Sequence, residues 1–296
     1  RRVPSLWRSP ELCEQGYATL REGMRDFAVI AQTVCGIDFC HQEEGHPPKR
    51  KREFFAKVLA DNAARPEHAL AILYHVGESF ADKSVESAAR WVVEAAEAGA
   101  HRLGHAIALG MAPELFAEAP RGVREELVGE RLDQIAFELE HAGELAALRY
   151  PLDERALRRE AESLRKKLAA DTAPGAAEPT VEIDYRPAER REALRIFQDY
   201  AMQRVRATGA SIECCPTSNL RIARLERPEN HPLRRFLAAG LPVVISADDP
   251  GILRTALTAE LDQVANWPGV SAGDLVAVRE RAWESRSGLL SGRGQA

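Results

Sequence analysis

The sequence has no apolar run long enough to cross a membrane, since a spanning helix needs about 18 or more consecutive apolar residues. It also lacks an excess of positive charge, with a formal net charge of −5 and a pI near 6.0. The positive field that draws proteins onto phosphate backbones is therefore missing. No signal-peptide core follows the first residues. We expect a soluble, cytoplasmic protein with no membrane partner and no general nucleic-acid binding.

Cysteine is scarce: there are five residues, an odd number, and no two stand at CxxC spacing. This pattern predicts neither a disulfide framework nor a cysteine zinc site, and it favours reduced, partly buried thiols. An initiator methionine is also missing, and the first residues read as the middle of a chain. We interpret the sequence as a fragment of a longer protein.

What is present is a pattern of short apolar runs, each followed by a helical pattern. The runs cover residues 34–39, 71–75, 102–106, 211–215 and 242–247. Between the second and third runs, apolar residues from 82 to 99 recur at helical spacing, and Gly99 is placed to end that helix. A shorter helix is expected at 232–239. Strands that alternate with helices predict parallel βα units, and therefore an α/β protein.

This alternation breaks between residues 111 and 210, where Glu, Arg, Ala and Leu dominate. Long helices are expected at 121–149, 153–170 and 187–207. We interpret the stretch as an inserted helical subdomain. The chain then divides into a first part of the main domain at 1–110, the insertion at 111–210, and the rest of the main domain at 211–296.

Chemically active side chains follow the predicted strands. They are Asp38, His41 and Glu43 after the first strand, His75 and Glu78 after the second, His105 after the third, Cys215 to Asn219 after the fourth, and Asp248 and Asp249 after the fifth. Each has an ordinary structural explanation by itself; Asp-Asp-Pro, for example, commonly begins a helix. Because the carboxyl ends of parallel strands meet at one edge, their joint order indicates a functional site.

That order resembles the adenosine deaminase family of metal-dependent hydrolases, which includes adenine and AMP deaminases. The matching motifs are Gly-Ile-Asp-Phe at 36–39, His-x-Gly-Glu at 75–78, Arg-x-Gly-His at 102–105, Cys-Pro-Thr-Ser-Asn at 215–219, His-Pro-Leu at 231–233, Gly-Leu-Pro-Val at 240–243 and Ala-Asp-Asp-Pro at 247–250. The resemblance implies a TIM (β/α)8 barrel of the metal-dependent hydrolase type that lacks its first strands and carries the inserted helical subdomain.

The resemblance also implies a role for each residue. His75 and Asp248 would bind zinc, and Glu78 would pass a proton to the ring of a purine substrate. His105 would orient the attacking water, and Asp249 would hydrogen-bond the purine. Asn219 and Ser218 are interpreted as loop-shaping residues. The implied reaction converts an adenine nucleoside or nucleotide to its inosine form and releases ammonia.

Two departures from the family pattern stand out. The family has a His-x-His pair on its first strand, and none occurs among the eight histidines here. With strands one to three missing, either the natural protein is longer or another chain supplies these ligands. His41 stands where the family has a glycine, and it either protrudes toward the substrate or lies on the surface. A second His-x-Gly-Glu string, at 141–144, has helical surroundings and is interpreted as helix surface.

Two other functions remain open. One is a catalytically inactive, deaminase-like barrel that binds nucleotides or serves as an assembly subunit, because the insertion is similar to those of long bacterial deaminases in phage-defence complexes. That hypothesis predicts a homo-oligomer held through 111–210. The other is a metal hydrolase acting on a pyrimidine or an amide. The basic run at 49–52 is interpreted as a solvated charge run, with phosphate binding as the alternative.

Overall fold

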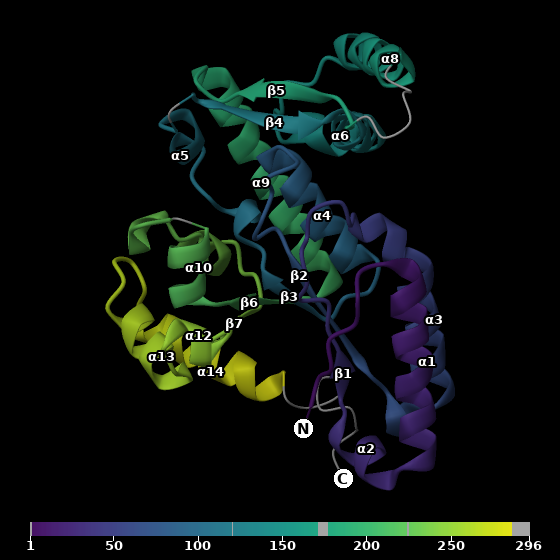
Figure 1. Cartoon of the computed structure of the whole chain (residues 1–296). Helices are drawn as coiled ribbons and strands as arrows, with labels where there is room; N and C mark the ends of the chain where they lie inside the picture. Colours follow the sequence, from purple (N-terminus) through teal and green to yellow (C-terminus); the bar gives the residue numbers. More distant parts are fainter. Residues whose placement is uncertain (1, 120, 171–176, 224, 286–296) are drawn as a thin grey trace.

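The computed structural model of this chain describes residues 2–119, 121–170, 177–223 and 225–285. Its centre is a parallel sheet of five strands in the order β1-β2-β3-β6-β7 (Figure 1). The strands are β1 Gly36–Ile37, β2 Ala71–Val76, β3 Arg102–His105, β6 Ser211–Cys214 and β7 Val243–Ile245. Each lies within or overlaps one of the five apolar runs, so the predicted α/β class and its strands are confirmed.

The edges of this sheet show how far it extends. Outside β1, Arg2 and Ser5 form isolated parallel bridges with Val34 and Asp38, and β7 stands at the other end of the strand order. Within the described residues the strands form an open sheet and not a closed ring. The closed barrel with missing strands therefore stays a prediction, while the parallel α/β sheet is observed.

The helices cover the sheet and extend beyond it. They are α1 Pro10–Asp26, α2 Ala28–Thr33, α3 Arg52–Ala64, α4 Val85–Glu97, α5 Glu114–Ala117, α6 Val128–Glu140, α7 Ala142–Ala147, α8 Glu154–Ala170, α9 Ala188–Thr208, α10 Pro216–Ile222, α11 Leu233–Ala238, α12 Pro250–Leu253, α13 Leu257–Ala265 and α14 Ala272–Glu284. Short 3-10 turns lie at Pro48–Lys51, Pro66–His68, Ile107–Leu109 and Pro228–Asn230. None of the helices in these described ranges combines the length and apolar character needed to cross a membrane.

Helix α4 is buried more completely than its sequence pattern predicts. Its spacing predicts one apolar stripe against the sheet, yet Val85 to Ala96 are buried all around the helix. The polar face is covered because α6 and α9 pack on it, and Arg90 there pairs with Glu94 and with Glu130 of α6, each at 2.5 Å. Ion pairs and hydrogen bonds are what allow charged side chains to be buried.

The insertion contains strands that the sequence did not predict. β4 (Val123–Leu127) and β5 (Thr180–Asp184) form a two-stranded antiparallel sheet, so a single helix over 121–149 is wrong. Charged residues mask the alternation expected of a strand, and the partner strand lies more than fifty residues away. The helices expected at 153–170 and 187–207 are confirmed as α8 and α9. In Figure 1, α6, α8, β4 and β5 form a lobe above the main sheet.

Helix α9 connects this lobe to the main sheet. It runs alongside α4 (Figure 1), and its buried Phe197, Tyr200 and Ala201 belong to the same hydrophobic core as β2 and β3. We expected this helix inside the inserted subdomain, but its packing places it with the main core. Gly209 ends the helix with a φ of 76°, and β6 begins two residues later.

Candidate active site

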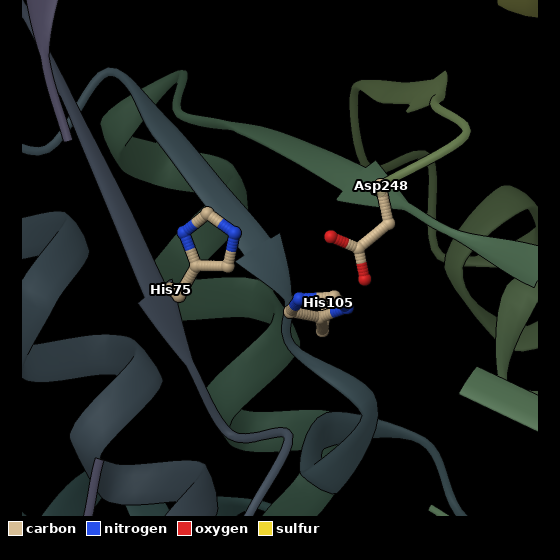
Figure 2. A group of neighbouring side chains, drawn as sticks. All are labelled: His75, His105 and Asp248. Atoms are coloured by element: carbon tan, nitrogen blue, oxygen red, sulfur yellow. The ribbon is translucent and has the colours of Figure 1, made fainter. Parts of the chain in front are cut away.

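Three of the predicted site residues meet at the carboxyl edge of the sheet. His75 lies on β2, His105 ends β3, and Asp248 follows β7. One donor atom from each side chain lies within 4.8 Å of the others (Figure 2). His105 and Asp248 have φ angles of 64° and 55°, a left-handed conformation that ordinary side chains rarely adopt and that clusters at functional sites.

The glycine of the Arg-x-Gly-His motif makes room for His75. Gly104 on β3 is paired in register with His75 on β2. A Cβ atom at Gly104 would lie only 3.0 Å from His75 Cγ and 3.2 Å from His75 Cα. A larger residue at this position would therefore push the imidazole out of its place.

Asp38, directly after β1, orients the ring of His75. His75 Nδ1 lies 3.1 Å from an Asp38 carboxylate oxygen. A carboxylate accepts hydrogen bonds, so Nδ1 carries the proton and Nε2 keeps its lone pair. Burial lowers the pKa of His75, but the hydrogen bond and charge of Asp38 outweigh it and the pKa is raised. Such a carboxylate partner is typical of a metal-binding histidine.

His105 is buried between two polar groups, with 1% of the residue exposed. Its Nδ1 lies 2.9 Å from the Asn219 side-chain nitrogen, and its Nε2 lies 3.2 Å from Glu78 Oε2. Burial, together with the nearby imidazoles of His75 and His231, holds the pKa of His105 well below its usual value. The imidazole is therefore neutral at physiological pH.

Glu78 is a carboxyl group suited to proton transfer. Burial and the nearby negative charge of Asp248 raise its pKa to about 7. Its Oε1 atom is buried and has no hydrogen-bond partner among the described residues. A carboxyl group whose pKa is near neutral can both give and accept a proton at physiological pH.

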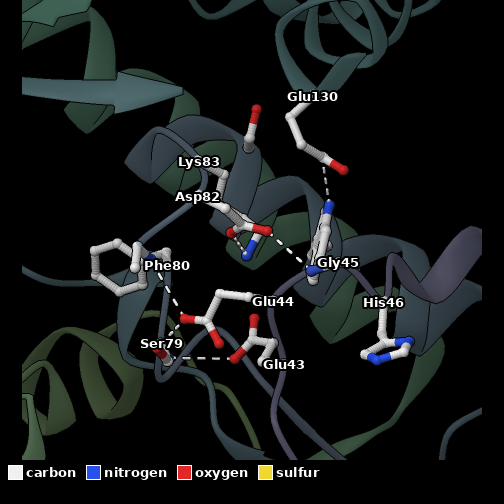
Figure 3. A network of polar contacts seen from close by, with 12 residues as sticks. Glu43, Glu44, Gly45, His46, Ser79, Phe80, Asp82, Lys83 and Glu130 are labelled. Carbon is white, nitrogen blue, oxygen red and sulfur yellow. Dashed lines mark hydrogen bonds and ion pairs between the residues drawn. The ribbon is translucent and has the colours of Figure 1, made fainter. Parts of the chain in front are cut away.

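The loop that carries Glu78 is held by a second carboxylate. The buried Glu43 accepts hydrogen bonds from the backbone N–H groups of Gly77, Glu78 and Ser79, at 2.9, 3.2 and 3.2 Å. Figure 3 shows Glu43 and the neighbouring Glu44 directed toward Ser79. The sequence pattern marks Glu43 as a polar residue after the first strand. It does not predict that Glu43 holds the backbone of residues 77–79, because that role depends on the loop after the second strand.

Arg8 holds the ends of the first two strands together, a role that the sequence pattern does not predict. The buried guanidinium donates hydrogen bonds to the backbone oxygens of Phe39 and His75, at 2.7 and 2.6 Å, and to that of His41 at 2.8 Å. A single guanidinium therefore links the peptide after β1 to the peptide of His75. Its distance in sequence from both strands explains why no motif indicated it.

The two aspartates after β7 differ in position. Asp248 faces the two histidines, although the residue itself is exposed (Figure 2). Asp249 caps α12, because its Oδ1 accepts a hydrogen bond from the Ile252 N–H at 3.1 Å and Pro250 occupies the first turn. The helix-capping interpretation of Asp-Asp-Pro is thus confirmed, and it uses one of the two carboxylate oxygens of Asp249.

The other residues singled out in the sequence are not part of the group formed by His75, His105 and Asp248. His41 is exposed and stacks on Trp7, with ring centroids 4.3 Å apart. His141 of the second His-x-Gly-Glu string lies between α6 and α7 and contacts Tyr200 and Arg204, so its helical interpretation is confirmed. In the basic run, Lys51 is buried against aromatic rings, so that residue is not a solvated charge. Of the five cysteines, Cys40 is exposed and the other four are buried.

The donor groups fit a zinc ion. Two imidazoles and one carboxylate are ligand types that zinc accepts, and catalytic zinc sites combine such ligands with an open position. The free Nε2 of His75 and the unpartnered Glu78 oxygen both lie at this edge. The same donors would also hold other divalent transition metals.

Comparisons with known proteins find similarity to deaminases. Residues 188–287 match the family model for adenosine deaminase. This range includes Asn219, His231, Asp248 and Asp249, while His75, Glu78 and His105 lie before it. The fold is similar to the crystal structure of an adenine deaminase from Arthrobacter aurescens, with a TM-score of 0.50 at 15% identity. That match covers 96% of this chain and 55% of the other.

Curated relatives carry related names. The chain is 32% identical to an adenine deaminase from Sinorhizobium medicae over 101 residues, 34% of this chain and 31% of the relative. It is 38% identical to an aminodeoxyfutalosine deaminase from Acidothermus cellulolyticus over 96 residues, 31% and 27% of the two chains. It is 36% identical to an adenosine deaminase from Clostridium botulinum over 74 residues, 25% and 22% of the two chains. The aligned stretches thus span less than a third of each relative, and within them the chain is similar to deaminases of the adenosine deaminase family.

Proposed function

We propose that this chain carries the centre of a zinc-dependent hydrolase that removes the 6-amino group of an adenine nucleoside or nucleotide and releases ammonia. The observation that carries the proposal is the meeting of His75, His105 and Asp248 at one sheet edge, beside a half-buried Glu78 with a raised pKa. The match to the family model and two relatives named for adenine and adenosine support the substrate class.

Zinc would be held by His75 through Nε2 and by Asp248 through its carboxylate. When bound, zinc supplies a hydrolytic nucleophile at neutral pH by lowering the pKa of water. Asp38 keeps the His75 ring in the orientation that presents Nε2. Two protein ligands are fewer than the three that catalytic zinc usually has, so we propose that further ligands, like the family's His-x-His pair, complete the site.

Three side chains would act on the substrate. Glu78 holds a proton part of the time near pH 7 and can donate it to a ring nitrogen of the purine. The neutral His105 would orient the attacking water and stabilise negative charge that develops during attack. Asp249 would hydrogen-bond the purine ring with the carboxylate oxygen that does not cap α12.

The second His-x-Gly-Glu string provides a matched control for the experiment. Glu78→Gln and Glu144→Gln make the same substitution in the same four-residue motif, once at the sheet edge and once on the lobe helices. We expect Glu78→Gln to lower ammonia release by roughly 100-fold or more while zinc binding persists. Glu144→Gln should change neither. Undiminished turnover in Glu78→Gln would remove Glu78 from the mechanism.

The substrate is tested with adenine, adenosine, AMP, ATP and cytidine, with ammonia release and ligand binding measured separately. Ammonia from an adenine compound supports the proposal, and a preference for cytidine would overturn the purine assignment. Binding of a nucleotide to the zinc-loaded protein without ammonia release would favour the inactive, nucleotide-binding alternative.

We also propose that residues 111–210 are inserted in the sequence between the two parts of the main domain, 1–110 and 211–296, and that the lobe within this stretch, without α9, mediates assembly into a homo-oligomer. The lobe of α6, α8, β4 and β5 that projects from the main sheet supports this division (Figure 1). Mass photometry tests the assembly, and a monomer at micromolar concentration would contradict it.

A further inference from the structure

A buried chain of hydrogen bonds leads from the start of α11 to the active site. His231 and Asn219 are 3% and 0% exposed, and they connect end to end with His105. The Leu233 backbone nitrogen lies 3.0 Å from His231 Nδ1. His231 Nε2 lies 3.1 Å from Asn219 Oδ1. Asn219 Nδ2 lies 2.9 Å from His105 Nδ1, where the chain of hydrogen bonds ends, and His105 Nε2 lies 3.2 Å from Glu78 Oε2.

The direction of each hydrogen bond in this chain follows from the first donor, the Leu233 N–H. The Leu233 N–H can only donate, so His231 Nδ1 accepts and carries no proton. Burial lowers the pKa of His231 to about 3, so the ring is neutral and its proton is on Nε2. His231 therefore donates to Asn219 Oδ1. The Cys215 N–H donates to the same oxygen at 3.2 Å, which fixes the orientation of the amide independently.

With its oxygen fixed in this way, Asn219 presents its NH2 group to His105. The 2.9 Å contact is then a hydrogen bond from Asn219 to His105 Nδ1, which must be unprotonated. With Nδ1 accepting a hydrogen bond, the one proton of the imidazole is on Nε2, 3.2 Å from Glu78 Oε2. In this arrangement each hydrogen bond from the Leu233 N–H to His105 Nδ1 has one donor and one acceptor.

We infer that Asn219 and His231 are positioning residues that hold His105 as an Nε2–H donor facing Glu78. Nε2 then has no lone pair for a metal, so His105 acts as a hydrogen-bond donor beside the zinc ligands and is not itself a ligand. The assignment of the proton rests on the hydrogen bonds alone, whereas its catalytic consequence rests on the proposed function. Asn219 thus has a defined role beyond shaping the loop.

Nuclear magnetic resonance of the chain with 15N-labelled histidine tests the proton position. Long-range proton–nitrogen correlation distinguishes Nδ1–H from Nε2–H in each ring, and loss of one signal set in His105→Asn assigns His105. We expect the wild type to show Nε2–H at His105. Added zinc should change the Nε2 signal of His75 and leave the proton on His105 Nε2. Nδ1–H in the wild type, or loss of the Nε2 proton with zinc, would overturn the inference.

Substitutions in the hydrogen-bond chain test the proton position more sharply than the wild type alone. Asn219→Asp keeps the shape but replaces the donor facing His105 with an acceptor, so His105 Nδ1 should gain a proton. His231→Leu removes the donor to Asn219 and should produce a mixture of His105 forms, and His231→Gln, which can still donate, should restore Nε2–H. Thr217→Val is the matched control, because it removes a bond from the same helix α10 to Gln263 and leaves the chain intact.

Activity provides the second measurement. In a zinc-loaded, active protein, Asn219→Asp should lower kcat by roughly 10- to 100-fold, the usual effect of losing an outer partner of a site histidine, with KM little changed. An unchanged proton on His105 in Asn219→Asp would overturn the inference even if the activity falls. If the proton moves as expected and the wild type releases no ammonia, the hydrogen-bond chain stands and the proposed function fails.

Discussion

Asp38 and His75 face each other across neighbouring strands, so in the proposed zinc site Asp38 would influence metal affinity without being a ligand. We expect Asp38→Asn to weaken zinc binding by about tenfold, because a neutral amide polarises the imidazole less than a carboxylate does. A competition titration against a zinc-binding dye measures the change. Asp61→Asn is the control, since Asp61 accepts a hydrogen bond from the Tyr17 hydroxyl at 2.7 Å, away from the site residues. Equal affinities in both variants would contradict the prediction.

His231 makes the stability of the fold depend on pH. Burial lowers the pKa of this histidine to about 3, against about 6.5 for an unfolded chain. Between these values the unfolded state binds a proton that the native state does not, so this contribution to stability falls as the pH drops from about 6.5. We expect the free energy of unfolding of the wild type to decrease more steeply with acidity than that of His231→Gln. Urea titrations at several pH values between 4 and 7 measure both slopes, and parallel slopes would contradict the prediction.

At the scale of elements, the segment after β1 stabilises the loop after β2 through hydrogen bonds. Glu43 holds the N–H groups of residues 77–79, and Asp82 accepts a hydrogen bond from the Gly45 N–H at 2.9 Å (Figure 3). Glu43→Gln places an NH2 group against backbone donors, which leaves buried groups unsatisfied. We expect a loss of about 1–3 kcal/mol in the free energy of unfolding, with faster amide exchange at residues 77–79.

Glu44→Gln is the control for this prediction. Glu44 stands next to Glu43 and also contacts Ser79 and Ala81, but its contacts are exposed to solvent. Its loss should cost less than Glu43→Gln, and the exchange at residues 77 and 78 should stay slow. If the two variants lose the same stability, the burial of Glu43 does not determine its contribution.

Also at the scale of elements, some features of the fold and the site could be predicted from the sequence and others could not. The five strands and their terminal residues followed from local apolar runs, because a buried strand needs only its own residues to be recognised. Strand β4 was missed because its pairing partner is distant and charged residues mask its alternation. The link from His231 through Asn219 to His105 joins three elements, so only the tertiary structure reveals it.

At the scale of the whole molecule, one buried arginine ties the lobe to the main sheet. Arg90 of α4 pairs with Glu130 of α6, and Glu130 also accepts a hydrogen bond from the Trp91 indole at 2.8 Å. Arg90→Met would leave buried carboxylates without their counter-charge, so we expect a loss of about 3–5 kcal/mol in the free energy of unfolding. The exposed pair of Arg158 with Glu154 provides the control, and Arg158→Met should cost about 0.5 kcal/mol or less. Urea unfolding of both variants measures the difference, and similar losses would contradict it.

The packing of α9 limits how this molecule can be divided. A helix of 21 residues is roughly 30 Å long, and this one enters β6 through Gly209 and Ala210 alone. Excision of the whole stretch 111–210 as a cassette would remove Phe197 and Tyr200 from the core beneath the candidate site. An engineer who wishes to graft or shorten the lobe must therefore cut before α9. The helix both attaches the lobe and forms part of the core on which the candidate site rests.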